Sequence, residues 1–323
     1  MPAKKVVPLN ARPIAVLGEN LVDLLVAPDA TVHAVIGGGP LNVARTVARL
    51  GREAHFFSGT SSDAFGGFVR DALVESGVAL ALPATLDAPT TLAVVELNPV
   101  GPRYHFHLTD TAAFNLDAGA TQRALDEVEH WSALYFGTLG LLVEPMASLG
   151  EAIVLSAAPE TLVVIDPNCR PSAVRDEPEY RARVARLSAR ADVVKVSTED
   201  LDYLYPRLSH HDAAHAILDV AARCVVVTDG RDPVVAVTAR GRVSVDVAAT
   251  EVVDTVGAGD ALVGAFMTWW TGHDLGRADL YDAPTLVAAL AAAVDVARIT
   301  CQRAGAQPPR RHEVSGLEGW RWL

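Results

Sequence analysis

Two aspartates flank a glycine-rich turn in the segment Asp254-Thr-Val-Gly-Ala-Gly-Asp260. An apolar run over 261–270 follows, with the length and small residues of a packed helix. A glycine-rich turn that opens a helix leaves backbone N–H groups unpaired, and the helix dipole adds partial positive charge there. Such a place binds anions, phosphate above all. Because Asp260 would lie where an acceptor hydroxyl approaches that phosphate, the segment predicts phosphoryl transfer to an alcohol.

In this interpretation Asp260 is the catalytic base, and the N–H groups of Gly257, Ala258 and Gly259 stabilise charge on the transferring phosphoryl group. A carboxylate at a helix N-terminus is expected to have a lowered pKa, which phosphoryl transfer tolerates because the acceptor proton leaves late. Helix capping is the competing explanation of Asp260. Capping explains neither the lack of bulk at three consecutive turn residues nor the second aspartate, Asp254.

Five further short motifs occur in order along the chain. They are Gly18-Glu-Asn-Leu-Val-Asp23, Gly37-Gly-Gly-Pro-Leu-Asn-Val-Ala44, Gly59-Thr-Ser-Ser-Asp-Ala-Phe-Gly66, Asp166-Pro-Asn-Cys-Arg170 and Gly305-Ala306. Together with the segment from Asp254 to Phe266, they resemble the landmarks of the ribokinase-like (PfkB) sugar kinases. The resemblance extends over about residues 12–309, nearly the whole chain. Short glycine motifs are common one by one, but their shared order makes the resemblance a strong signal.

The resemblance implies a sugar site made by Asp23, Gly38, Gly39 and Asn42. Asp23 follows the first strand by a few residues, where ligands bind in open α/β folds, and its carboxylate can accept two sugar hydroxyls. The two glycines let the backbone approach the sugar closely, and Asn42 offers a donor and an acceptor. The alternatives are a solvated loop acid for Asp23 and helix capping for Asn42.

The motif that ends at Arg170 is similar to fructokinases and 2-keto-3-deoxygluconate kinases within the family. Arg170 could bind a phosphate, or the carboxylate of an acid substrate, in a bidentate fashion. The alternative is a salt bridge from Arg170 to Asp166 or to another local acid.

Lys195 is the only lysine after Lys5 in an arginine-rich chain. One explanation is that the nucleotide site needs a compact ammonium group at this position. Chance survival of one lysine is an equally good explanation. Asp254 resembles a family position near a monovalent cation beside the anion hole, and an ordinary turn carboxylate is its competitor.

Two further segments resemble parts of the family's nucleotide site. Ser197-Thr-Glu-Asp200 stands where the family often has Asn-x-x-Glu, linked to Mg2+ and phosphate. This departure equally resembles a capping box, so Asp200 would act on Mg2+ only through a water molecule. Thr228-Asp-Gly230 resembles the family's Thr-x-Gly turn near the nucleotide phosphates, or is a plain turn at the end of a strand.

Apolar strand patterns alternate with helix-like stretches along most of the chain. The strand candidates are 14–17, 133–136, 162–165, 193–196 and 224–228. Residues 42–50 have helical periodicity, with Gly51 as a C-cap. This alternation predicts an α/β fold with a mostly parallel, Rossmann-like sheet that is covered by helices on both faces.

Two β-rich stretches, 31–36 and 90–97, break this pattern, and a turn at 99–102 and a strand at 103–108 follow the second. They predict a small inserted β lid, with an edge of the main sheet as the alternative. In the family such strands cover the sugar site and often form a dimer interface, so the resemblance implies a homodimer. The expected parts are a kinase core (12–30, 38–88 and 110–310), a lid (31–37 and 89–109), a tail (1–11) and a C-terminal extension (311–323).

The chain has 323 residues, half of them hydrophobic, which is enough for one large α/β domain with an appendage. Its net charge of −12 argues against a general nucleic-acid or membrane-surface binder. We expect no apolar run of membrane-spanning length and no signal peptide at the start. Three cysteines, far apart, indicate a reducing cytoplasm without a disulfide frame or a zinc site.

These observations predict a cytoplasmic, ATP-dependent kinase that phosphorylates a primary hydroxyl of a fructose-like sugar. ATP and Mg2+ are the expected cofactors, with K+ as an open addition. A 2-keto-3-deoxygluconate kinase or a nucleoside kinase is the alternative enzyme, and a catalytically silent sugar- or nucleotide-binding regulator is the rival of another class. The sequence has no Gly-x-x-x-x-Gly-Lys-Ser/Thr loop and no Gly-x-Gly-x-x-Gly after the first strand, which disfavours P-loop enzymes and dinucleotide-binding oxidoreductases.

Overall fold

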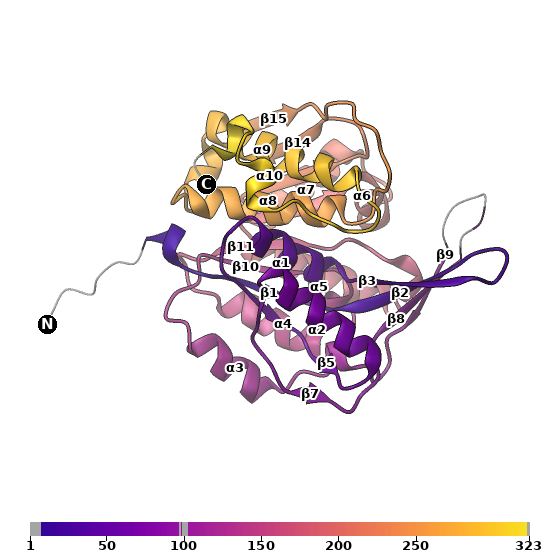
Figure 1. Ribbon diagram of the computed structural model, residues 1–323. Coiled ribbons are helices and arrows are strands. Elements are labelled where there is room, and N and C mark those ends of the chain that lie inside the picture. Colours follow the sequence, from indigo (N-terminus) through magenta and orange to yellow (C-terminus); the bar gives the residue numbers. More distant parts are fainter. Residues whose placement is uncertain (1–7, 97, 99–102, 322–323) are drawn as a thin grey trace, which may run out of the picture.

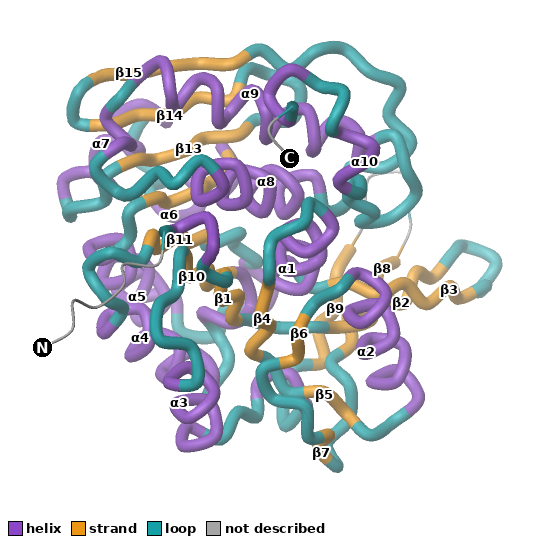
Figure 2. Tube along the Cα trace, turned by 60° about the vertical axis from the view of Figure 1, so that its left-hand side comes forward, coloured by secondary structure: helices purple, strands orange, loops and turns teal. Residues whose placement is uncertain are grey.

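A nine-stranded sheet runs through the body of the protein (Figure 2). The computed structural model describes residues 8–96, 98 and 103–321. The strand order is β15-β14-β13-β12-β11-β10-β1-β4-β6. From β13 to β6 neighbouring strands pair in parallel, whereas β14 and β15 add an antiparallel edge. The strands are β1 (Ile14–Leu17), β4 (Ala54–Phe57), β6 (Ala79–Leu80), β10 (Ala133–Gly137), β11 (Leu162–Asp166), β12 (Val193–Ser197), β13 (Cys224–Thr228), β14 (Val234–Thr238) and β15 (Gly241–Val245).

Helices cover both faces of this sheet and form a separate apolar core on each. Every residue of β1 is buried, with Ile14 and Val16 in one core and Ala15 and Leu17 in the other. One face carries α1 (Gly39–Arg49), α2 (Ala64–Ser76), α8 (Ala258–Gly272) and α9 (Ala283–Cys301). The other carries α3 (Ala118–Asp126), α4 (Met146–Ser156), α5 (Glu177–Arg190), α6 (Thr198–Leu204) and α7 (His210–Asp219). The predicted α/β class is confirmed, and the central strands are mostly apolar because helices cover both of their faces.

A second sheet of four strands projects from one side of the body (Figure 1). Its order is β3-β2-β8-β9, from β2 (Leu21–Val26), β3 (Val32–Gly37), β8 (Leu92–Glu96) and β9 (Arg103–His107). The predicted small sheet is therefore present, and its predicted turn at 99–102 lies outside the described residues. Two short strands, β5 (Thr60–Ser61) and β7 (Thr85–Leu86), form a third pairing.

The assignment of residues 12–30 to the core was wrong for β2. This strand pairs with β3 in antiparallel register and with β8 in parallel register, so it belongs to the small sheet. The physical reason is a tight turn, in which the N–H of Ala27 donates to the carbonyl of Thr31 over 2.9 Å. That turn closes β2 and β3 into a hairpin, and a hairpin cannot be divided between two sheets.

The expectation about membrane-spanning length was also wrong, because α9 is long and apolar enough to cross a membrane by length and composition. In the structure α9 is a core helix that packs along α8, and Ala289, Leu290 and Ala293 are fully buried. Its apolar composition serves the interior of the domain.

The two ends of the described chain are held against the body. Arg52 donates hydrogen bonds to the carbonyls of Leu9 (2.9 Å) and Arg12 (2.8 Å) and fixes a short 3-10 turn at Leu9–Ala11, while residues 1–7 lie outside the described part. At the other end α10 (Arg311–Val314) precedes Trp320, which is fully buried and donates to the carbonyl of Ala292 over 3.0 Å. The predicted C-terminal extension therefore packs on α9.

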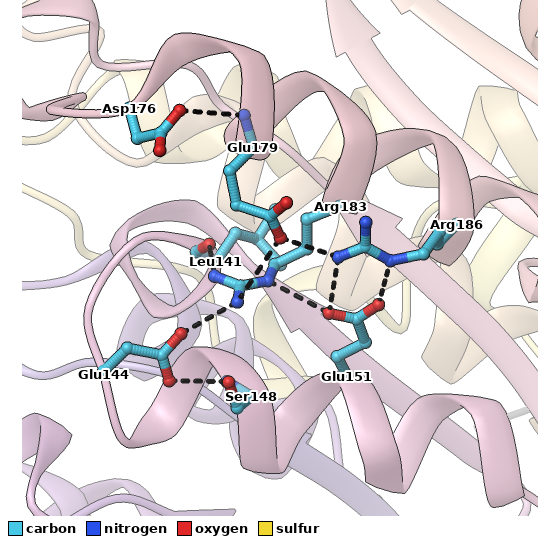
Figure 3. Close-up of polar contacts among 8 residues, drawn as sticks. All are labelled: Leu141, Glu144, Ser148, Glu151, Asp176, Glu179, Arg183 and Arg186. Carbon is cyan, nitrogen blue, oxygen red and sulfur yellow. Dashed lines mark hydrogen bonds and ion pairs between the residues drawn. The ribbon is translucent and has the colours of Figure 1, made fainter.

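An ion-pair network between α4 and α5 fixes the turn after β10 (Figure 3). The buried Arg183 donates to the carbonyl of Leu141 (3.1 Å) and pairs with Glu144 (2.8 Å) and Glu151 (3.1 Å). Glu151 also binds Arg186. A buried guanidinium is tolerated only when its donors are paired, so the network holds the turn at Thr138–Leu141 in one place at the carboxyl end of the sheet.

Candidate active site

A cavity of about 1070 Å³ lies where the carboxyl ends of the parallel strands meet the small sheet and the start of α8. This is where ligands bind in open α/β folds. Its wall contains the predicted residues Asp23, Gly38, Gly39, Asn42, Arg170, Lys195, Ser197, Asp200, Thr228, Gly230, Gly257, Ala258, Gly259 and Asp260. Asp254 is the one predicted residue that does not line it. The structure thus gathers the predicted set around one space, while their individual roles stay predictions.

Helix α8 begins at the glycine-rich turn, as the sequence predicts. Gly257 is its N-cap in the left-handed region, with φ 77°, and a Cβ there would approach Ala306 Cβ to 2.5 Å. In the described part of the chain, the N–H groups of Gly257 and Gly259 have no hydrogen-bond partner, so they are available to an anion. The N–H of Ala258 instead donates to the carbonyl of Thr255 over 3.2 Å. The predicted three-donor anion hole therefore has two unengaged donors, because the turn itself uses the third.

Asp260 lies in the first turn of α8 with a side chain that is only 8% exposed. Its Oδ2 accepts a hydrogen bond from Nδ2 of Asn42 over 2.9 Å. Burial raises the pKa of Asp260, opposed by the Asn42 hydrogen bond and the charges of Lys195 and Arg170. The expected lowering of this pKa was wrong, because loss of hydration outweighs the hydrogen bond and the nearby positive charges. The raised pKa makes Asp260 a stronger base than an exposed carboxylate.

Neither Asp260 nor Asn42 acts as a helix cap, although capping was the alternative role for both residues. The N-cap of α1 is Gly38 and that of α8 is Gly257. Asn42 also keeps its buried Oδ1 without a hydrogen-bond partner, on the wall of the cavity. A free acceptor in this position fits a hydroxyl donor of a ligand.

Lys195 forms a buried pair with Asp166 beneath the turn. Its Nζ lies 3.2 Å from Oδ2 of Asp166, and a Cβ on Gly259 would approach this Nζ to 3.1 Å. Burial alone would lower the pKa of Lys195, but Asp166, Asp200 and Asp260 raise it, so the ammonium stays charged. Burial raises the pKa of Asp166 to about 6, although Lys195 opposes this. The pair places a fixed positive charge beside the start of α8.

The sugar-site prediction falls at the other end of the cavity, under the small sheet. A Cβ on Gly37 would approach Oδ2 of Asp23 to 2.3 Å, so the glycine makes room for this carboxylate. Burial raises the pKa of Asp23 to about 6, and the nearby charge of Arg170 opposes the shift. Arg170 donates to the carbonyls of Asn168 (3.2 Å) and Cys169 (3.0 Å). The salt bridge proposed as its alternative does not involve Asp166, which pairs with Lys195.

Tyr104, Phe106 and Glu19 are among the residues of the cavity wall that sequence reasoning missed. Tyr104 and Phe106 on β9 stack with ring centroids 5.9 Å apart and line the cavity beside Asp23. Glu19 is 1% exposed, and its carboxylate accepts from Oγ1 of Thr138 and from the N–H of Gly140 (3.0 Å). Burial raises the pKa of Glu19 to about 7, opposed by these hydrogen bonds. The sequence held a signal for Glu19, since an acid two residues after a buried strand is expected to need hydrogen-bond partners.

Ser197 and Asp200 form the capping box that was the alternative reading of their motif. The N–H of Asp200 donates to Oγ of Ser197 (3.0 Å), and the N–H of Ser197 donates to Oδ2 of Asp200 (2.8 Å). Oδ1 of Asp200 accepts from the N–H of Cys169 over 2.6 Å. Both carboxylate oxygens are thus engaged by backbone, which favours a structural role. Among residues 8–96, 98 and 103–321, no group of three or more His, Cys, Asp or Glu side chains is placed to hold a metal ion.

Asp254 joins the turn to the segment after α9. Its Oδ1 accepts from the N–H of Val256 (3.0 Å) and its Oδ2 from the N–H of Gly305 (2.9 Å). In the part of the cavity where the sequence predicts the nucleotide, Oγ1 of Thr228 donates to the carbonyl of Val196 over 3.4 Å, and Gly230 has a left-handed φ of 51°. Both readings of the Thr228 segment, phosphate turn and plain turn, are compatible with this geometry.

Comparison with known proteins gives one consistent answer. Residues 14–313 match the family described as pfkB family carbohydrate kinase. Fructokinase from Rhizobium leguminosarum bv. trifolii is 33% identical over 248 residues, 75% of this chain and 75% of that protein. The structure of fructokinase with bound ATP from Xylella fastidiosa has a TM-score of 0.85 at 27% identity, covering 94% of this chain and 96% of that chain. A fructokinase double mutant from Vibrio cholerae O395, in a form with fructose, ADP and potassium ion, has a TM-score of 0.79 at 25% identity, covering 94% and 95%.

The family match spans nearly all of the chain and includes the turn, the small sheet and the cavity between them. This chain belongs to the pfkB family of carbohydrate kinases and is a phosphotransferase.

Proposed function

We propose that the protein transfers the γ-phosphoryl group of ATP to a primary hydroxyl of a fructose-like sugar. The observation that carries the proposal is the buried Asp260, which faces the same cavity as Asp23 and lies beside the unpaired N–H groups of Gly257 and Gly259. A base, an anion site and a polyol acceptor site in one space are what phosphoryl transfer to a sugar requires. The fructokinases among the compared proteins support this substrate class.

In the proposed reaction Asn42 holds Oδ2 of Asp260, which leaves Oδ1 for the acceptor hydroxyl. Asp260 orients this hydroxyl and takes its proton as the phosphoryl group is transferred. The N–H groups of Gly257 and Gly259, together with Lys195, stabilise negative charge on the phosphoryl oxygens. Asp23 and the backbone at Gly38 and Gly39 hold the sugar against the base.

The residues of the cavity fit ATP with Mg2+ carried on its phosphates. Mg2+ usually keeps several waters and is bound through substrate phosphates and one or two carboxylates, so no dedicated protein cage is needed. Ser197, Asp200, Thr228 and Gly230 border the end proposed for the nucleotide, where Asp200, already engaged by backbone N–H groups, would reach Mg2+ only through a water molecule. We place a K+ site between the turn of Asp254 and the segment at Gly305, which the Asp254 carboxylate holds together.

The small sheet is also the proposed homodimer interface. Val32 on β3 is 53% exposed and Tyr104 on β9 is 36% exposed, so the sheet leaves apolar surface for a second copy. Light scattering at micromolar concentration tests this, and a monomer there would contradict the dimer without affecting the kinase proposal. We propose a cytoplasmic location, in keeping with three free cysteines.

The decisive experiment combines an acceptor screen with the Asp260→Asn variant. The screen takes fructose, other ketoses, aldoses, 2-keto-3-deoxygluconate and ribosides, with release of ADP as the readout. Asp260→Asn removes the proton acceptor and keeps the turn, so kcat should fall about 100- to 10,000-fold while sugar and ATP still bind. A variant that keeps most of its kcat would refute the assignment of the base. Binding of sugar and ATP by a wild-type protein with no turnover on any acceptor would favour the silent regulator.

A further inference from the structure

Helix α1 carries a buried arginine that the reaction scheme does not use. Arg45 is 7% exposed, does not line the main cavity, and reaches the segment after α9. Its Nε donates to Oγ of Ser76 at the end of α2 over 3.1 Å, and one terminal nitrogen donates to the carbonyl of Ala306 over 3.1 Å. Burial lowers the pKa of Arg45 to about 10, so the guanidinium remains charged at neutral pH. A charged group buried in this way needs a structural or functional reason.

The partner of Arg45, Ala306, is in direct contact with the anion-binding turn. A Cβ placed on Gly257 would approach Cβ of Ala306 to 2.5 Å and its Cα to 3.0 Å, so the two backbones are packed as closely as glycine allows. The neighbouring Gly305 donates its N–H to Oδ2 of Asp254. The position of the segment at 305–306 therefore sets the position of Gly257.

These contacts close a ring around the catalytic base. At one point of the ring Asn42 on α1 binds Asp260 on α8 over 2.9 Å. One helical turn further along α1, Arg45 binds Ala306, which packs on Gly257, and Gly257 is the N-cap of the helix that carries Asp260. The same helix thus holds the base directly and the anion-binding turn through a relay of two contacts.

We infer that Arg45 is a positioning residue for the phosphoryl-transfer step, acting through Ala306 on the N–H groups at Gly257 and Gly259. This inference rests on the proposed function of that turn. Since Arg45 lies behind the turn and outside the main cavity, its loss should reduce the rate of transfer and leave affinity for the sugar nearly unchanged. Misplacing reacting groups by 1 Å can cost about 100-fold in rate, so a small shift of the turn is sufficient.

The chain supplies a matched control one turn further along α1. Arg49 is also buried and also donates to a backbone carbonyl of the same segment, that of Pro308, over 2.8 Å. Pro308 does not line the main cavity, whereas Gly257 does. Arg49→Ala therefore removes an equivalent link between α1 and this segment without touching the relay. Ser76→Ala is a second control, because it removes a partner of Arg45 and keeps the bond to Ala306.

The experiment measures kcat, both KM values and the melting temperature for Arg45→Ala, Arg45→Lys, Arg49→Ala and Ser76→Ala. We expect Arg45→Ala to lower kcat by about tenfold or more, with KM for the sugar changed less than about threefold. Arg45→Lys should recover part of the loss, because an ammonium can still reach one of the two acceptors. Both controls should keep kcat within about twofold, whatever their effect on melting temperature.

A second variant keeps the inference testable if Arg45→Ala does not fold. Ala306→Gly removes the Cβ that packs on Gly257 and should lower kcat in the same way. Combined with Arg45→Lys, it should cost less than the product of the two single effects, since both act through one contact. Equal kcat in Arg45 and Arg49 variants, or independent effects in the double variant, would overturn the inference. If Asp260→Asn keeps its turnover, the proposed function itself is at fault.

Discussion

The side-chain amide of Asn42 donates a 2.9 Å hydrogen bond to Oδ2 of Asp260 and so joins the first turns of α1 and α8. The two residues are 218 positions apart in the chain, yet both are buried and face one cavity. The contact fixes the orientation of the carboxylate and lowers its pKa against the effect of burial. Asn42 thus has a second role beside the sugar contact that the sequence suggests.

Replacing Asn42 by alanine should shift the pH profile of the enzyme. The Asn42 hydrogen bond stabilises the ionised form of Asp260, so its loss raises the pKa of Asp260 further. Because the base must be ionised to accept a proton, the acidic limb of the kcat profile should move to higher pH. Measuring kcat from pH 5 to 9 in both proteins checks this. An acidic limb that stays in place would mean that Asp260 does not govern it.

Replacing Asp23 by alanine should weaken sugar binding far more than ATP binding. Loss of a carboxylate that accepts two hydroxyls costs roughly 2–3 kcal/mol, about 30- to 150-fold in affinity. Since the pKa of Asp23 is about 6, sugar affinity of the wild-type protein should also fall as the pH drops below that value. Calorimetric titration of each ligand at pH 5 and pH 8 measures both effects. Equal losses for sugar and ATP would return Asp23 to a structural role.

Replacing one residue of the Lys195–Asp166 pair should lower the unfolding free energy more than replacing both. Lys195→Met leaves a carboxylate buried without its partner, at a cost of about 3–5 kcal/mol in unfolding free energy. The double variant Lys195→Met with Asp166→Leu should recover much of that stability, yet its kcat should remain low, because the positive charge beside the turn is gone. Chemical denaturation measures the unfolding free energy of each variant, and steady-state kinetics measures its kcat. A double variant with wild-type kcat would remove Lys195 from the nucleotide site.

Glu19 should make the stability of the protein depend on pH. Its pKa in the folded state is about 7, above the unfolded value of 4.5, so folding favours its protonated form. The contribution of Glu19 to stability is therefore complete below about pH 4.5 and is lost as the pH rises through 7, a change of roughly 3 kcal/mol. The side chain in the Glu19→Gln variant cannot ionise. The unfolding free energy of this variant should therefore increase relative to that of the wild type between pH 5 and pH 8. A constant difference over this range would show that Glu19 does not titrate there.

Activity should require Mg2+ and rise with K+ relative to Na+. A cation between the Asp254 turn and the segment at Gly305 would steady the anion-binding turn without touching the substrate. Initial rates in Tris buffer with KCl or NaCl at fixed ionic strength provide the comparison. Asp254→Asn is the matched variant and should lose the difference between the two salts. Identical rates in wild type with either salt, and with neither, would leave Asp254 a purely structural residue.

The sequence predicts those parts of the site that depend on neighbours along the chain. The turn from Gly257 to Asp260 could be recognised because its glycines, its helix and its carboxylate are contiguous. Burial is a property of the tertiary fold, and for this reason the direction of the Asp260 pKa shift was predicted wrongly. Arg45 could not be found at all, since its partners, Ser76 and the carbonyl of Ala306, lie 31 and 261 positions away in the chain.

The contrast between local pattern and tertiary contact also explains which parts of the fold were predicted from the sequence. The parallel strands β1, β10, β11, β12 and β13 are mostly apolar, so their local pattern already identifies them, whereas β4 and β6 were not predicted. The strand β2 is half-buried in part and continues almost directly from β1, which made it look like part of the core. Only its pairing with β3 and β8 assigns it to the small sheet, and strand pairing is not written in local composition.

The hairpin of β2 and β3 connects the predicted sugar contact, Asp23, to the helix that carries Asn42. Asp23 lies on the outgoing strand, and the returning strand ends at Gly37, so only Gly38 separates this hairpin from the helix that carries Asn42. Gly38 has φ 110°, and a Cβ there would approach the carbonyl oxygen of Glu19 to 2.7 Å, so this joint is confined as well as unusual. In the proposed function, a sugar bound to Asp23 would therefore be linked through one covalent segment to Asn42, whose amide orients the carboxylate of Asp260. Binding of the acceptor and orientation of the Asp260 carboxylate would then be coupled through the backbone at Gly38.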